Sequence, residues 1–450
     1  MHALSGQSPF HDCSHGGQVA IDSEVEPSLA VDPADPHRLL AAWQQDRNAS
    51  GGALGLVTAA SADGGATWRT SIPPHLFKCA AGPYALASDP VVSIGAGGRA
   101  FLGAVAVKVT GSGENAEFDT DIAASASVDG GVSWGDPVIV ASSDDPRVSF
   151  DKETLVADPR TEGTAYAVWV RYTQQDPNQP ARTNETLFSR TTDGGTSWST
   201  PVSIHSGETE TQFHQLVELP EGSLVDVFIE APSLSDKPPL AARLAAIRSE
   251  DGGVTWSPSA TVADITFTVP TDPTRRDGVR GTGQGILAAA APDGSVYVVW
   301  AEERLQGGSF VAVVRSDDSG VTWSAPVKMA TDRNQPFIPG IAVAADGTVG
   351  VGWYELQPIA PTGTRAPLFA DVRLAWSVDR SATWSELHVA GPFDMHMAKL
   401  SVVGDFVGDY FGLAALPGGF GVAYAVAAPL ASVGATDVFF SRVELSAAGG

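Results

Sequence analysis

The segment SVDGGVSW (127–134) is one of six copies of a single eight-residue motif in this chain of 450 residues. The remaining copies are SADGGATW (61–68), TTDGGTSW (191–198), SEDGGVTW (249–256), SDDSGVTW (316–323) and SVDRSATW (377–384). Their closing tryptophans follow one another at steps of 66, 64, 58, 67 and 61 residues. A motif repeated at near-constant spacing is typical of proteins that use one structural unit many times.

The residue types of this motif, Ser/Thr-x-Asp-x-Gly-x-Ser/Thr-Trp, predict a tight β-hairpin turn. Asp and Ser side chains bond to nearby backbone amides, and Gly takes a positive φ without a Cβ clash. The final Trp then covers the turn and buries a large apolar area between neighbouring sheets. We therefore expect the motif aspartates, such as Asp63, Asp129 and Asp193, to be structural and not catalytic. The last copy has Ser381 where the others have Gly, and we expect its turn to be looser.

Between the motifs, short apolar or alternating runs are separated by Gly, Pro, Asp and Asn, which indicates an all-β chain. In the third unit the motif lies between the last two of four expected strands, which are 153–159, 164–172, 185–193 and 197–205. The sequence pattern of the first two strands recurs at 26–43, 89–107, 215–229, 286–300 and 341–353. This pattern predicts a β-propeller of four-stranded blades.

The C-terminal part repeats the pattern once more without the motif. YFGLAALPGGFGVAYAVAAP (410–429) would give two strands, and TDVFFSRVEL (436–445) a third. GQVAIDS (17–23) could supply the fourth and close the ring, since a propeller cannot leave an edge strand exposed. We therefore favour seven blades, six of them with the motif, over the alternative of six. The expected organisation is an N-terminal arm (1–23), a single propeller domain (24–445) and a C-terminal tail (446–450).

The composition fits a large acidic β protein. Its 27 Lys and Arg against 52 Asp and Glu give a net charge of −25, which argues against nucleic acid as a partner. No stretch approaches the roughly 20 apolar residues that a membrane span needs. We expect a monomer that is secreted or extracytoplasmic in a bacterium, although the opening MHALSGQSPF lacks the charged and apolar regions of a signal peptide. Cys13 and Cys79 could form one disulfide, tying the N-terminal arm to the first blade, or stay free thiols.

The repeated motifs and their four-strand units resemble the sialidase superfamily, also called BNR or Asp-box repeat proteins. The resemblance covers about residues 24 to 445, and phrases such as EPSLAVDP, DKETLVADP and GDYFGLAA resemble a bacterial branch of exo-sialidase-like glycoside hydrolases. It implies a propeller fold and a glycan substrate. The chain departs from the family's pattern, because no arginine precedes the Ile-Pro pair of FIPG (337–340) and a seventh blade exceeds the usual six.

In a propeller the innermost strands line a central channel, and the loops before these strands and after the second strands build one face. Polar residues at the innermost-strand entries include Glu24, Glu26 and Asp89. Glycoside hydrolysis needs two carboxyl groups, or a tyrosine nucleophile with a carboxylate, so the candidate catalytic residues are Asp151, Glu153, Glu302, Asp409 and Tyr410. Arginines could hold an anionic sugar, and the candidate binding residues are Asp46, Arg47, Lys152, Arg171, Tyr172, His214, Arg280, Arg304, Arg333 and Glu355.

These residues also allow other interpretations. Asp151 and Glu153 could cap a turn or pair with Lys152, and the arginines could bridge to neighbouring acids. The tryptophans that end four second strands could pack between blades or stack on sugars; they are Trp43, Trp169, Trp300 and Trp353. The leading function is a sialidase-like hydrolase of an anionic or decorated glycan. One alternative is a lyase of uronate polysaccharides with His214 or a tyrosine such as Tyr172 as its base, and the other is a non-catalytic glycan- or protein-binding propeller. We expect no cofactor and no metal site, since no His/Cys cluster has zinc-ligand spacing.

Overall fold

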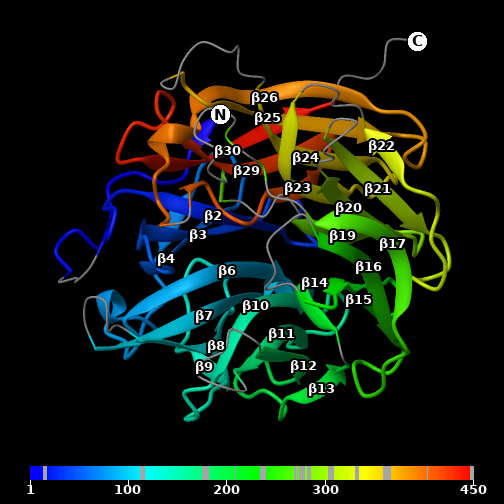
Figure 1. The fold of residues 1–450 in the computed structure, drawn as a ribbon, viewed down its shortest axis with the longest axis horizontal. Coiled ribbons are helices and arrows are strands. Elements are labelled where there is room, and N and C mark those ends of the chain that lie inside the picture. The colour runs from blue at the N-terminus through cyan, green and yellow to red at the C-terminus, as the bar shows by residue number, and fades with distance from the viewer. Residues whose placement is uncertain are drawn as a thin grey trace.

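The regular secondary structure of the described residues is almost entirely β-strand (Figure 1). The computed structural model describes residues 1–13, 18–111, 117–174, 182–207, 209–233, 240–267, 270, 272, 279–280, 285–302, 309–329, 334–357, 366–402 and 404–445. Within these residues the helical elements are short 3₁₀ turns such as η1 (Lys78–Ala80). No helix in this part of the chain has the length and apolar character to span a membrane.

The strands form antiparallel sheets arranged around a common centre, with β2, β6, β10, β14, β19 and β23 closest to it (Figure 1). A separate two-stranded sheet is parallel and pairs β18 (Val279–Arg280) with β27 (Asp405–Phe406). From the innermost strand outward, the first unit is β2 (Glu24–Val31), β3 (Leu39–Arg47), β4 (Ala53–Ser61) and β5 (Arg69–Ser71). The second unit is β6 (Leu86–Ile94), β7 (Ala100–Thr110), β8 (Glu117–Ser127) and β9 (Val138–Ala141). They share one sheet through a single pair, Ala53 with Ala87.

Each later unit is a sheet of its own. The third and fourth are β10 (Val148–Ala157), β11 (Ala165–Gln174), β12 (Arg182–Thr191), β13 (Val202–His205), and β14 (Glu210–Glu218), β15 (Leu224–Ala231), β16 (Leu240–Ser249), β17 (Ala260–Phe267). The fifth and sixth are β19 (Ile286–Ala290), β20 (Val296–Glu302), β21 (Phe310–Ser316), β22 (Val327–Met329), and β23 (Gln335–Val343), β24 (Val349–Leu356), β25 (Phe369–Ser377), β26 (Ser385–Asp394).

A last sheet joins the two ends of the chain. It contains β28 (Gly412–Leu416), β29 (Gly419–Ala427) and β30 (Thr436–Glu444), with β1 (His2–Ala3) paired to β30. The predicted all-β propeller with four-stranded blades is therefore confirmed. Dividing the eight-stranded sheet at its single linking pair is our interpretation, so the preference for seven blades over six stays a prediction, as do the domain limits. The tail 446–450 lies outside the described residues.

The expectation that residues 17–23 supply the closing strand is wrong. His2 pairs with Phe440 and Ala3 with Phe439, so the very start of the chain completes the last sheet. Val19 instead forms a bridge with Asn48 beyond the end of β3. The segment 18–23 therefore covers the first unit.

Hydrogen bonds of the repeated motif confirm the predicted hairpin turn. In the first copy Ser61 Oγ donates to Asp63 Oδ1 at 2.8 Å, and the Gly65 amide donates to Ser61 Oγ at 2.9 Å. Thr67 Oγ1 donates to Asp63 Oδ2 at 2.6 Å. Hydrogen bonds from Thr67 and Ser61 lower the pKa of Asp63 to about 2, so this carboxylate stays ionised. The aspartate acts as a fixed acceptor inside the turn.

The expected looser turn at the sixth copy is wrong. Ser381 takes a positive φ of 69° and its amide donates to Ser377 Oγ at 2.9 Å, as the glycine amide does in the other copies. Thr383 Oγ1 donates to Asp379 Oδ2 at 2.6 Å. The side-chain hydrogen bonds thus hold a non-glycine residue in the left-handed region, where a Cβ costs about 1–2 kcal/mol.

The buried interior settles two further alternatives. The four second-strand tryptophans are between 0% and 2% exposed, which confirms that they pack between blades and do not stack on sugars.

Cys13 and Cys79 form a disulfide. Because Cys79 lies in η1, between β5 and β6, the bond ties the N-terminal arm to the first two units.

Candidate functional site

A β-bulge interrupts five of the innermost strands near their start, whereas β19 and β28 pair with their neighbours without a register shift. The register of β2 breaks between Val25 and Ser28, that of β6 between Ser88 and Val91, and that of β10 between Asp151 and Thr154; β14 and β23 break likewise. A residue in each bulge has a φ between 49° and 59°, namely Glu26, Asp89, Lys152, Phe213 and Ile338. Non-glycine residues held in this region are strained, and such strain concentrates at functional sites.

Side chains from two of these bulges meet two residues of the segment that precedes β28. We call this group the bulge cluster: Asp89, Asp151, Lys152, Asp409 and Tyr410. Lys152 Nζ lies 3.0 Å from Asp409 Oδ2 and 3.6 Å from Asp89 Oδ2. Tyr410 OH donates to the same Asp89 oxygen at 2.9 Å. The other Asp89 oxygen accepts from Ser88 Oγ at 2.6 Å. A tyrosine hydroxyl and a lysine thus share one carboxylate.

The pKa values within the bulge cluster move in opposite directions. Burial pushes the pKa of Asp89 up, but Lys152, Ser88 and Tyr410 outweigh burial and keep it below its usual value. Burial raises the pKa of Asp151 above its usual value, and Asp89 and Asp409 add to the rise. Burial also raises the pKa of Tyr410 well above its usual value. The cluster therefore holds an ionised carboxylate beside a carboxyl that keeps its proton more readily.

Lys152 is the internal cation of the cluster. Its side chain is 14% exposed, and its Nζ lies 5.4 Å from the ring centre of Phe213. Burial opposes the charge, but Asp409, Asp89 and Asp151 raise its pKa well above the usual value. The ammonium group therefore stays charged, and it holds Asp89 and Asp409 in place.

A second polar group adjoins the cluster around Glu26. Gln44 Nε2 donates to Glu26 Oε2, and Arg47 NH1 donates to Gln44 Oε1 at 2.6 Å and to the Gly52 carbonyl at 3.0 Å. Burial raises the pKa of Glu26, and the charges of Asp89 and Asp409 add to the rise. Arg47 is only 2% exposed. Arg47 is therefore a buried residue that supports the site through its hydrogen bond to Gln44.

Phe406 lies against two arginines. The guanidinium carbon of Arg47 lies 4.8 Å from its ring centre, and that of Arg280 lies 4.6 Å away. Arg280 NH1 also donates to Ser401 Oγ at 3.1 Å. Arg280 is partly exposed, whereas Arg47 is buried, so Arg280 can contact a molecule at this face.

Several predicted binding residues have partners elsewhere in the fold. Asp46 accepts hydrogen bonds from Ser8 Oγ and the Asp22 amide, so it holds the N-terminal arm. Arg171 forms an ion pair with Glu185 on the neighbouring strand of the same sheet.

His214 is fully buried in the fourth unit. Its Nδ1 lies 2.7 Å from Asp226 Oδ2, and its Nε2 lies 3.2 Å from Thr186 Oγ1. Because both ring nitrogens have protein partners and the side chain is 0% exposed, a lyase base at this position has no access to substrate.

The remaining predicted residues are also buried or not described. Glu302 lies near the indole N–H of Trp300 at 3.4 Å, Glu355 pairs with Arg373 at 3.3 Å, and Tyr172 is 2% exposed. Arg304 and Arg333 lie outside the described residues.

Two acidic residues of the site, Glu26 and Asp89, were absent from the candidate catalytic and binding residues. Glu26, Asp89 and Lys152 follow one another at steps of 63 residues, and each lies in a bulge. This spacing was the available signal, because it matches the period of the repeated motif. The bulges bring these three side chains together, and the sequence alone does not reveal the bulges.

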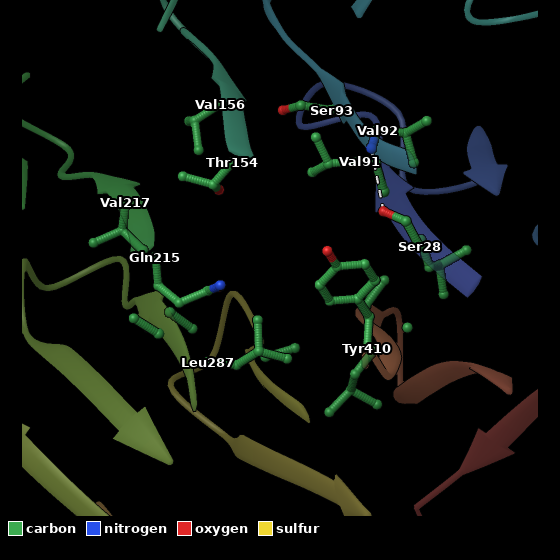
Figure 2. A pocket seen from close by; sticks show the side chains of 18 of the residues that line it. Ser28, Val91, Val92, Ser93, Thr154, Val156, Gln215, Val217, Leu287 and Tyr410 are labelled. Atoms are coloured by element: carbon green, nitrogen blue, oxygen red, sulfur yellow. Dashed lines mark hydrogen bonds between the residues drawn. The ribbon is translucent and has the colours of Figure 1, made fainter. Parts of the chain in front are cut away.

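A cavity of about 460 Å³ runs along the innermost strands. Residues of β2, β6, β10, β14, β19, β23 and β28 line it, as predicted for a central channel. Figure 2 shows Tyr410 projecting into this space, with Val91, Val217 and Leu287 on the walls. Its lining is mostly apolar, and its polar lining residues include Glu153 and Tyr410, of which Tyr410 belongs to the bulge cluster.

Comparisons with known proteins agree with this architecture. No family model matches the chain. A sialidase from Micromonospora viridifaciens is 28% identical over 170 residues, which are 34% of this chain and 26% of that relative. The chain thus spans about a quarter of the length of the curated relative it matches.

Two solved structures share the fold. The Hadza microbial sialidase Hz136 has a TM-score of 0.50 at 14% identity, covering 87% of this chain and 74% of that chain. A protein of unknown function from Dyadobacter fermentans has a TM-score of 0.51 at 17% identity, covering 80% of this chain and 96% of that chain. At these identities the likeness concerns the fold alone.

Proposed function

We propose, from the resemblance of the chain to the sialidase superfamily in sequence and fold, that it is a glycoside hydrolase acting on an anionic or decorated glycan. The reaction centre is the bulge cluster. The observation that carries the proposal is the hydrogen bond from Tyr410 OH to Asp89 Oδ2 at 2.9 Å, with Lys152 fixing the same carboxylate.

Tyr410 acts as the nucleophile and Asp89 as its base. A phenol is a weak nucleophile until a base takes its proton, and the pKa of Tyr410 is raised by burial. Asp89 accepts the hydroxyl proton directly, and its own lowered pKa keeps it ionised before the reaction. The tyrosine oxygen then bonds to the anomeric carbon while the glycosidic bond breaks.

Asp151 acts as the proton donor to the leaving oxygen. Its pKa is raised by burial, and its side chain keeps partial exposure toward solvent. Water then cleaves the tyrosine–sugar bond, giving its proton to Asp151 as the phenol recovers the proton held by Asp89. Lys152 and Asp409 position these groups and do not exchange protons with the substrate.

The number of carboxyl groups favours a hydrolase over a lyase. Glu26, Asp89, Asp151, Glu153 and Asp409 supply five carboxyl groups around the centre, and glycoside hydrolysis uses carboxyl groups as proton donor and base. Arg280 is a partly exposed cation at this face, and we assign it to the anionic part of the substrate. The disulfide supports an extracytoplasmic location, because such bonds persist in oxidising compartments.

The test is the activity of Tyr410→Phe on sialosides and other anionic glycosides. Removing the nucleophile should lower kcat at least a hundredfold with little change in KM. Tyr424→Phe is the matched control, because Tyr424 is a buried tyrosine whose hydroxyl bonds Ser441 at 2.7 Å in the last sheet. Equal activity of Tyr410→Phe and Tyr424→Phe on every cleaved substrate would exclude Tyr410 as the nucleophile.

A further inference from the structure

Tryptophans of the repeated motif cover seams between neighbouring units. The Trp68 ring of the first unit lies 5.0 Å, centre to centre, from the Phe440 ring on β30 of the last sheet. The Trp256 ring of the fourth unit lies 5.5 Å from the Phe188 ring on β12 of the third. Both pairs meet edge to face, an arrangement that aromatic rings favour. In these two seams an indole ring therefore covers the third strand of the neighbouring unit.

The last sheet has no motif of its own. In the sixth unit the first residue of the motif, Ser377, pairs with Val349 at the start of the second strand. The same pairing occurs in the five other units that carry the motif. Glu444 holds that place in the last sheet, opposite Gly419. The motif requires Ser or Thr there and Asp two residues later, where the sequence has Glu444 and Ser446. The last sheet therefore supplies no motif tryptophan to the seam that it forms with the sixth unit.

A pocket of about 280 Å³ lies at this seam, where the sixth unit and the last sheet are neighbours around the centre (Figure 1). We call it the seam pocket. Trp376 of β25 lines one side, and Leu445, which follows β30, lines the other; both are partly exposed, so a molecule in the pocket can touch them. Both pack against a buried cluster that contains Phe420. The volume is just below the range of about 300–1,000 Å³ for drug-sized ligands, which suits a single small ring system.

Trp376 takes the place of an arginine that connects units at two other seams. The residue before the motif is Arg190 in the third unit and Arg315 in the fifth. Arg190 NH1 donates to the Gly252 carbonyl of the next motif at 2.9 Å, and Arg315 NH1 donates to the Arg380 carbonyl at 2.8 Å. Because the last sheet has no motif turn to present such a carbonyl, an arginine at position 376 would lack this partner. An aromatic ring stands there instead.

The seam pocket is remote from the proposed reaction centre. Tyr410 precedes the start of β28 at Gly412, whereas Leu416, at the end of the same strand, lines the pocket. Six residues of extended chain separate the two positions by about 20 Å. A ligand in the seam pocket therefore leaves the space beside Tyr410 free.

We infer that the seam pocket binds a small molecule with an indole ring, which lies against Trp376 where a motif tryptophan of the last sheet would cover the seam. An indole ring suits this position, because the same ring covers the third strand at two other seams. Thr383 and Ser385 are exposed at the rim, and their hydroxyl oxygens can accept from the indole N–H. This binding site goes beyond glycan cleavage and does not depend on it.

The test is a ¹⁹F NMR titration of 5-fluoroindole with the full chain, with unlabelled indole as the competitor. Wild type should give a saturable shift that indole reverses. Trp376→Arg removes the ring and introduces the residue type found before the third and fifth motifs, and it should lower the affinity at least about tenfold. Trp376→Phe keeps an aromatic ring and should retain most of the affinity.

Two adjacent alanines place the ligand in the pocket. Ala344 is partly exposed and lines the pocket, whereas Ala345 follows it in the same turn, is exposed and lies outside the lining. Ala344→Trp should fill the pocket and abolish the shift. Ala345→Trp adds the same bulk beside the pocket and should bind like wild type. Circular dichroism and thermal unfolding establish that each variant is folded.

No saturable shift with wild type, or equal affinity in wild type and Trp376→Arg, would overturn the inference. Unchanged binding by Ala344→Trp would overturn the placement at the seam. These titrations need no glycan substrate, so the inference can fail while hydrolysis is observed, and it can hold if no glycan is cleaved.

Discussion

Replacing Glu24 by Gln should stabilise the protein, and the gain should grow with pH. Glu24 begins β2 and is 0% exposed. It accepts hydrogen bonds from Gln45 Nε2 at 2.5 Å and Ser5 Oγ at 2.9 Å. Burial raises its pKa to about 9, and the charges of Asp437 and Asp46 add to the rise. At neutral pH the folded protein therefore keeps Glu24 protonated.

The sign follows from proton linkage. Between the usual pKa of 4.5 and the folded value of about 9, the folded state binds one proton that the unfolded state has lost. The contribution of Glu24 is therefore fully present below pH 4.5 and declines as pH rises toward 9, by about 1.4 kcal/mol for each pH unit. From pH 5.5 to pH 7.5 the loss is about 2.7 kcal/mol.

The amide that Glu24→Gln introduces is neutral at every pH, and it can accept from Gln45 and donate to Ser5. The unfolding free energy of Glu24→Gln minus that of wild type should thus rise from about 1.4 kcal/mol at pH 5.5 to about 4 kcal/mol at pH 7.5. Urea unfolding at four pH values measures it. Glu250→Gln, at a side chain that is 78% exposed, is the control and should give no such slope. A difference that stays constant with pH would refute the assignment of a protonated Glu24.

Three further outcomes are expected. Ser381→Gly should raise the unfolding free energy by about 1 kcal/mol, because glycine takes the positive φ without strain; Ser381→Ala should not, and equal values for the two in urea unfolding would contradict this. Glycan cleavage should fall as pH rises, because Asp151 must stay protonated, and Asp151→Asn should lose that limb of the pH–rate profile; an unchanged profile would exclude Asp151 as the donor. Cys13→Ala together with Cys79→Ala should lower the unfolding free energy by about 2–5 kcal/mol, since the bond closes a loop across 66 positions; equal urea midpoints would show that it contributes no stability.

The fold could be predicted because its signal is local. Each motif contains in eight residues both the donors and the acceptors of its own turn, such as Ser61, Asp63 and Thr67. The closing strand could not be predicted in the same way. His2 and Ala3 form a two-residue pairing with β30, and two residues carry no periodic pattern.

The candidate site could be predicted only in part. Their position at the start of the innermost strands predicted Asp151, Lys152, Asp409 and Tyr410 as site residues, and the structure brings these four together. The contact between Lys152 and Asp409 joins residues 257 positions apart, and no local pattern encodes it. Sequence types alone also gave no means of separating Arg280, which is partly exposed, from Arg47, which the fold buries.

The most direct test of the central claim, that the bulge cluster hydrolyses a glycan, is mass spectrometry of products from sialosides and uronate polysaccharides incubated in ¹⁸O-labelled water. Wild type and Tyr424→Phe should yield saturated fragments that carry one labelled oxygen, and Tyr410→Phe should yield far fewer. Unsaturated fragments would identify a lyase, and no product from any glycan of the panel would favour a binding propeller; either result would contradict hydrolysis by the bulge cluster.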